Sequence, residues 1–116
     1  MAANVSQTQE HRAIFAHKDG TISAETINTP YTPSGSQSLV RVKYSGINPA
    51  DIRHIYMGLY DKSSVTGLEW VGTVVDTGKE SSFSVGLEIF GVSMPGFGIP
   101  RPLCSGAHQD FLLAEK

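Results

Sequence analysis

The sequence has only one cysteine, Cys104, in 116 residues. A single thiol excludes an intramolecular disulfide and a cysteine-rich zinc site. Basic residues are also few: nine Lys and Arg stand against eleven Asp and Glu, which argues against a nucleic-acid partner. The apolar run 89–100 is short and interrupted by glycine and proline, so we expect no membrane contact. Residues 1–12 lack the apolar core of a signal peptide, which predicts a cytoplasmic protein.

The chain has the size and composition of one globular domain. A length of 116 residues with 40% hydrophobic residues is sufficient for a core without covalent cross-links. Residues 1–10 are polar, and we expect them to be flexible. The folded domain is therefore placed at 11–116.

Short strand-like segments separated by glycine and proline predict a mainly β fold. The clearest is 39–46, where Val40, Val42 and Tyr44 alternate with two basic residues and are expected to share the buried face. Further strands are expected over 12–17, 23–29, 67–78, 84–92 and 106–114.

One short helix is expected from Asn48 to about Gly58, because Asn48 can cap it and Pro49 suits its first turn. Together these elements predict a small antiparallel barrel, partly open, with one short helix.

Five motifs follow one another along the chain: LVRVKYSGINPAD, MGLY, GLEWVGTVVDTG, FSVGLEIFG and GAHQDFLLAE. Their order and approximate spacing resemble the N-terminal GroES-like domain of the medium-chain dehydrogenase/reductase family. Each motif alone is weak, but the five together cover the chain from about Arg12 to its last residues. The resemblance implies a GroES-like, partly open β-barrel.

Within that family, the chain resembles the zinc-independent branch, such as quinone reductases and fungal trans-acting enoyl reductases. The family's alcohol dehydrogenases have a cysteine and a histidine where this chain has Asn48 and Leu68. Neither replacement offers the thiolate or imidazole that a catalytic zinc needs, so we expect no metal. Glu69, the residue after Leu68, is then expected to have a structural role, paired with a basic group or a backbone donor.

The family's Rossmann domain, with its glycine-rich dinucleotide turn, is not found in this sequence. We therefore expect no cofactor on this chain, and NADPH only if another chain supplies that domain.

Seven residues are candidates for a site. Carboxylate, imidazole and phenol groups can move protons, and amide or aromatic groups can hold a substrate. Each also has a structural interpretation, such as helix capping, helix-dipole charge, solvent exposure or packing. The candidate catalytic residues are Asp51, His54, Tyr56 and His108, and the candidate substrate-binding residues are Asn48, Tyr60 and Trp70.

Three functions remain open at this point. The chain is a GroES-like substrate domain related to zinc-independent, NADPH-dependent reductases, without its own cofactor domain. Alternatively it is a stand-alone isomerase or cyclase that acts by acid–base chemistry on a hydrophobic biosynthetic intermediate, or a non-catalytic binding module. A small hydrophobic molecule is the expected ligand, and an exposed sheet edge predicts a homodimer.

Overall fold

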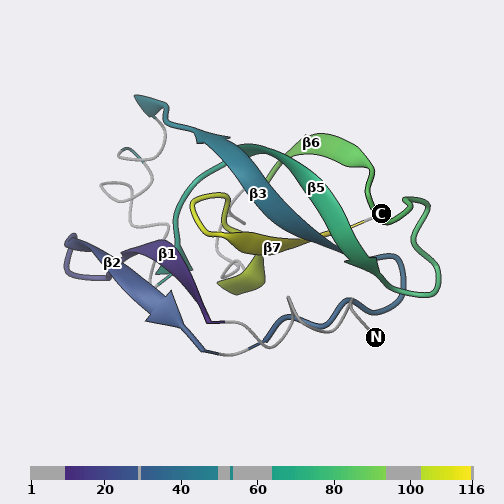
Figure 1. Ribbon diagram of the computed structural model, residues 1–116. Helices are drawn as coiled ribbons and strands as arrows, with labels where there is room; N and C mark the ends of the chain where they lie inside the picture. The colour runs from purple at the N-terminus through teal and green to yellow at the C-terminus, as the bar shows by residue number, and fades with distance from the viewer. Residues whose placement is uncertain (1–9, 29, 50–52, 54–63, 94–102, 116) are drawn as a thin grey trace.

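The computed structural model describes residues 10–28, 30–49, 53, 64–93 and 103–115 (Figure 1). These residues form two antiparallel sheets, with strand orders β2–β1–β4 and β6–β5–β3–β7. The predicted mainly β, partly open fold is thereby confirmed. No helix in these ranges is long and apolar enough to span a bilayer. The elements are β1 (His11–Ala16), β2 (Ile22–Ile27), β3 (Ser38–Gly46), β4 (Ser64–Val65), β5 (Glu69–Thr77), β6 (Glu88–Val92), the 3-10 turn η1 (Leu103–Ser105) and β7 (Phe111–Ala114).

The strands agree with the predicted segments except at β4, β6 and β7. The strand expected over 84–92 begins only at Glu88. β4 was not predicted, because two residues are too short to show a period, and its pairing with Phe15 and Ala16 of β1 defines it. The segment 106–114 was expected to be one strand, but β7 begins only at Phe111, and before it Gln109 makes an isolated bridge to Ala13. Of the predicted helix, Pro49 and Arg53 are helical and the remainder lies outside the described residues. The N-terminal segment expected to be flexible is also outside them, apart from its last residue.

The predicted buried face of β3 is wrong at Tyr44. Val42 lies opposite Gly72 of β5, and Tyr44 lies opposite the next residue, Val71, so Lys43 is an extra residue in the ladder. A bulge of this kind reverses the sequence alternation beyond it. Tyr44 therefore faces outward with 72% of its surface exposed. Ser45 takes the inward position and lines the same hollow as Val42.

The four-stranded sheet carries apolar side chains on both faces. Leu39 and Val40 are adjacent in β3 and both are buried, but they belong to different clusters, because alternate side chains of a strand point to opposite faces. Leu39 packs with Phe15 and Val65 of the three-stranded sheet. Val40 packs on the other face with Trp70 and other apolar residues of the four-stranded sheet.

The segment before β7 joins the two sheets through backbone hydrogen bonds. The N–H of Ile14 in β1 donates to the carbonyl of His108 at 2.9 Å, and the N–H of His108 donates to the carbonyl of Thr66 at 2.9 Å. The N–H of Val42 in β3 donates to the carbonyl of Asp110 at 2.8 Å. His108 is thus held on both sides of its backbone, at the junction of the two sheets.

A buried polar cluster fills the core beside this junction. The side-chain oxygen of Gln109 accepts hydrogen bonds from the Tyr31 hydroxyl at 2.8 Å and from Nε2 of His11 at 3.1 Å. The Gln109 amide nitrogen donates to the carbonyl of Gly106 at 2.8 Å. Because an amide oxygen only accepts, the hydrogen lies on Nε2 of His11. Three segments distant in sequence are therefore joined by one side chain.

Candidate functional site

A groove of about 460 Å³ lies along the junction of the two sheets. This volume is within the usual range for small-molecule sites. Much of the lining is apolar, and polar side chains also line it from β1, from β3 and from the segment before β7. The apolar residues include Ala13, Ile14, Val42 and Ile47, and the polar or charged residues are Arg12, Lys43, Ser45, His108, Gln109 and Asp110.

Ser45 and His108 form a hydrogen-bonded pair in the groove. Nδ1 of the His108 ring is 2.7 Å from Oγ of Ser45, and both side chains are half-buried. Ser45 reaches this position because of the bulge at Lys43. The pair combines an imidazole, which can donate or accept a proton, with a hydroxyl that fixes the orientation of the ring.

Gly67 makes room for His108. Its φ is +99°, in the region that disfavours side chains, and an added Cβ would lie 2.7 Å from both Cγ and the backbone N of His108. No larger residue fits at position 67 without moving the histidine. The glycine before β5 therefore helps to position the candidate catalytic group.

Asn48 and Leu68, which the resemblance places at the family's zinc-ligand positions, carry neither a thiolate nor an imidazole. Leu68 is buried and aliphatic. Nδ2 of Asn48 donates to Oε1 of Glu69 at 3.3 Å. Glu69 was expected to pair with a basic group or a backbone donor, and the partner found here is a side-chain amide. The described part of the chain contains no cluster of three or more His, Cys, Asp or Glu side chains able to bind a metal ion.

Trp70 lies in the core and not in the groove. Its Nε1 donates to Oγ of Ser93 at 3.1 Å, and it packs with Val40 and Leu112. Gly91 lies against the ring, where an added Cβ would be 2.6 Å from a ring carbon. Trp70 also lines a second hollow of about 290 Å³. A substrate contact by Trp70 stays a prediction.

Three of the seven predicted site residues are described: Asn48, Trp70 and His108. Of these, His108 alone lines the groove. Asp51, His54, Tyr56 and Tyr60 lie outside the described residues. Sequence reasoning missed Ser45, because strict alternation along 39–46 would have turned its side chain outward.

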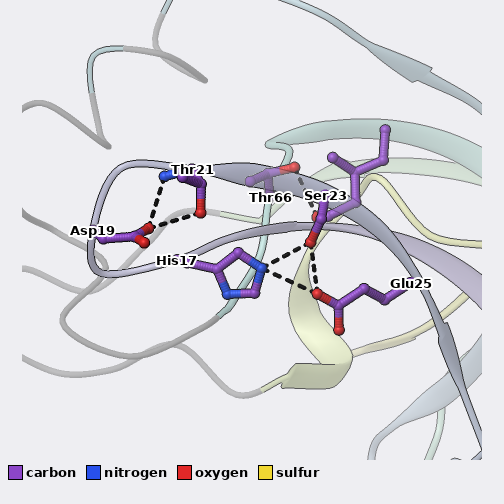
Figure 2. Close-up of polar contacts among 7 residues, drawn as sticks. His17, Asp19, Thr21, Ser23, Glu25 and Thr66 are labelled. Atoms are coloured by element: carbon purple, nitrogen blue, oxygen red, sulfur yellow. Dashed lines mark hydrogen bonds and ion pairs between the residues drawn. The ribbon is translucent and has the colours of Figure 1, made fainter.

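A second histidine–serine pair, His17 and Ser23, lies on the β1–β2 hairpin (Figure 2), and neither residue lines the groove. Nε2 of His17 is 2.8 Å from Oγ of Ser23 and 3.0 Å from a carboxylate oxygen of Glu25. The Ser23 hydroxyl donates to the same carboxylate at 2.6 Å. At the turn, hydrogen bonds from the side chain and backbone of Thr21 lower the pKa of Asp19. This cluster stabilises the hairpin and offers a comparison for the pair in the groove.

The comparisons with known proteins agree with this architecture. The sequence profile of the alcohol dehydrogenase GroES-like domain matches residues 34–112. An alcohol dehydrogenase superfamily protein from Novosphingobium aromaticivorans superposes with a TM-score of 0.73 at 26% identity, over 92% of this chain and 32% of that chain. The quinone oxidoreductase from Coxiella burnetii gives 0.71 at 20% identity, over 92% and 35%. The D-arabinose dehydrogenase from Sulfolobus solfataricus gives 0.66 at 19% identity, over 91% and 38%.

No curated protein matches the sequence. The chain spans about a third of the length of the solved structures named above. The profile match covers more than half of the chain, and the two-sheet fold agrees with it. The chain therefore belongs to the alcohol dehydrogenase GroES-like domain family, found in medium-chain dehydrogenases and reductases.

Proposed function

We propose that this chain provides the substrate-binding half of a zinc-independent reductase of its family. The observation that carries the proposal is the Ser45–His108 pair in a largely apolar groove of a GroES-like domain. Residues such as Ile14, Val42 and Ile47 suit a small hydrophobic molecule, and the pair suits a carbonyl oxygen on it.

The pairing around Asn48 supports the zinc-independent part of the proposal. The Asn48 amide already bonds the Glu69 carboxylate, and Leu68 has no ligand atom. A zinc ion prefers thiolate, imidazole or free carboxylate ligands. Polarisation of a substrate carbonyl is therefore assigned to hydrogen-bond donors of the protein.

The described residues do not fit a dinucleotide. They comprise strands and short helical turns, whereas a pyrophosphate is held where a glycine-rich turn opens a longer helix. NADPH, which supplies the hydride in this family, would be held by a Rossmann domain outside the described residues. That domain would belong to a longer form of the chain or to another chain.

In this proposal His108 acts on the substrate oxygen. Its imidazole donates a hydrogen bond to the carbonyl oxygen or delivers a proton to that atom. Ser45 is a positioning residue that holds the ring through Nδ1. Apolar side chains beside the pair, such as Val42, lower the local dielectric, which strengthens a hydrogen bond made there.

Ligand titration with 1,4-naphthoquinone, followed by amide chemical shifts, tests this assignment. We expect shifts that cluster at the groove residues, and a binding constant weakened at least about tenfold by His108→Phe. Ser45→Ala should weaken binding less. His17→Phe is the matched control, because His17 also contacts a serine but lies outside the groove. Unchanged binding in His108→Phe, or equal losses in both histidine variants, would contradict the proposal.

An isomerase or cyclase that works without a cofactor is the second candidate. The same pair favours it, because proton transfer by an imidazole needs no dinucleotide. Conversion of cyclohex-3-enone to cyclohex-2-enone by the chain alone, lost in His108→Phe, would favour this candidate. No conversion, together with naphthoquinone binding in the groove, would favour the reductase domain.

A further inference from the structure

Strand β6 is the outer strand of the four-stranded sheet, and among the described residues it pairs with β5 alone (Figure 1). Its pairing is continuous from Glu88 to Val92, with no bulge. Two hydrogen bonds mark which groups face β5: the N–H of Val74 donates to the carbonyl of Leu87 at 2.9 Å, and the N–H of Ser93 donates to the carbonyl of Leu68 at 2.6 Å.

Hydrogen-bonding direction alternates along an antiparallel strand. Since Leu87 and Ser93 face β5, Ile89 and Gly91 do so as well. The backbone N–H and C=O groups of the other three residues, Glu88, Phe90 and Val92, therefore point away from β5. They form a row of donors and acceptors along the edge of β6 that pairs with no other described strand.

The same edge carries exposed apolar side chains. Phe90 is 84% exposed and Val92 is 61% exposed. The register places Phe90 beside Val71, and Val71 beside Tyr44, so an apolar stripe crosses three strands and ends at the edge. An exposed apolar patch next to a free edge is typical of an interaction surface.

The edge has little to prevent pairing. Natural edge strands are usually protected by lysine, proline, a bulge or unpaired charge. β6 has no lysine, proline or bulge. Its single charged residue, Glu88, is already paired with Nζ of Lys43 at 2.6 Å.

We propose that β6 pairs with β6 of a second copy, antiparallel, about a twofold axis at Phe90. This register sets Phe90 opposite its own counterpart and Glu88 opposite Val92. All three outward-facing residues then take part in the ladder, and the two four-stranded sheets become one sheet. The two apolar stripes meet at an aromatic pair, and no like charges face each other.

A second copy is the occupant because this edge complements itself. β6 has five residues, and its central residue is one whose backbone groups point outward. The hydrogen-bonded pairs of the two β6 strands are therefore arranged symmetrically about a twofold axis at Phe90. This proposal is independent of the proposed function, because no β6 residue lines the groove at His108.

Cysteine cross-linking of the 116-residue chain tests the register in a Cys104→Ser background. Opposed residues in the hydrogen-bonded pairs have Cα atoms about 5.5 Å apart, within reach of a disulfide. With oxidised glutathione, Phe90→Cys should form a covalent dimer. Glu88→Cys or Val92→Cys alone should not, because each lies about 14 Å along the strand from its counterpart. An equal mixture of the last two should cross-link.

Sedimentation at micromolar concentration tests the association itself. The wild-type chain should be dimeric, and Phe90→Lys should weaken association at least about tenfold. Ile22→Lys is the matched control: Ile22 is 55% exposed on β2, the edge strand of the other sheet, and should leave the dimer intact. Val92→Lys repeats the test if Phe90→Lys fails to fold.

Three results would overturn the proposal: a monomeric wild type, equal loss in Ile22→Lys, or equal cross-linking of all single-cysteine variants. Naphthoquinone binding should be unchanged in Phe90→Lys, so the proposed ligand site in the groove and the proposed dimer at β6 are tested independently.

Discussion

Replacement of Gln109 by leucine tests the buried cluster that joins three segments of the chain. The Gln109 side-chain oxygen accepts from Tyr31 and His11, and its amide nitrogen donates to the Gly106 carbonyl. All three side chains of the cluster are buried. Leucine is similar in size but has no polar atom. The substitution therefore leaves two donors and one carbonyl without these partners.

The expected cost follows from the groups left unsatisfied. Each buried donor or acceptor without a partner costs about 1–3 kcal/mol, and three are left so, which predicts a cost of about 3–9 kcal/mol for Gln109→Leu. A domain of this size has about 5–15 kcal/mol of stability in total. Tyr31→Phe removes only one hydroxyl and leaves Gln109 bonded to His11, so it should cost about 1 kcal/mol. The double variant should cost about 1–3 kcal/mol less than the sum, because Tyr31 no longer has a stranded hydroxyl.

Urea unfolding followed by fluorescence measures these costs. Trp70 is the single tryptophan and is buried, so its emission reports on the fold. Gln109→Leu should lower the unfolding midpoint by about 1 M or more. Gln37→Leu is the matched control: its hydrogen bonds to Ser34 and Glu115 are at the surface, and its loss should cost less than about 1 kcal/mol. Equal midpoints for the two Gln→Leu variants would refute the reasoning.

Three further predictions concern single groups. Burial raises the pKa of the Tyr31 hydroxyl, so the folded state keeps a proton that the unfolded chain loses above about pH 10. The free energy of unfolding should therefore fall as the pH rises through that range. In urea unfolding between about pH 9 and 11, Tyr31→Phe should show a smaller fall. Gly67 and Gly86 have φ values of +99° and +94°, but an added Cβ meets His108 only at Gly67. By calorimetry Gly67→Ala should therefore cost at least about 2 kcal/mol more than Gly86→Ala, and similar costs would contradict the clash. Burial raises the pKa of the Cys104 thiol, so iodoacetamide should modify the folded chain at least about tenfold more slowly than the urea-unfolded chain, and equal rates would be inconsistent with it.

The alternation of apolar and polar residues, with glycine and proline between the segments, was sufficient to predict most of the strands. They were insufficient where long-range pairing decides the structure. β4 has two residues and exists because Val65 and Ser64 pair with β1. Tyr44 was assigned to the wrong face because the extra residue, Lys43, is visible only in the register of β3 against β5.

The site shows the same division. The family resemblance singled out His108, which lines the groove, and the replaced zinc ligands at Asn48 and Leu68. It could not find Ser45, whose inward position depends on the bulge. Nor could it show that Trp70 packs in the core beside Ser93 and not at His108. Local sequence patterns carry no information on which face of a bulged strand reaches which hollow.

The bulge at Lys43 also explains how one strand contributes to two surfaces. Tyr44 joins the outward stripe that ends at Phe90, and Ser45, the next residue, reaches inward to His108. In the metal-free site that we propose, a developing charge on oxygen would be stabilised by donors that are fixed before the substrate binds. Three features fix the position of His108: backbone hydrogen bonds from its N–H and to its carbonyl, the space left by Gly67, and the hydrogen bond between Nδ1 and Oγ of Ser45. A substitution at Gly67 or Ser45 should therefore displace the His108 imidazole even where the two sheets keep their fold.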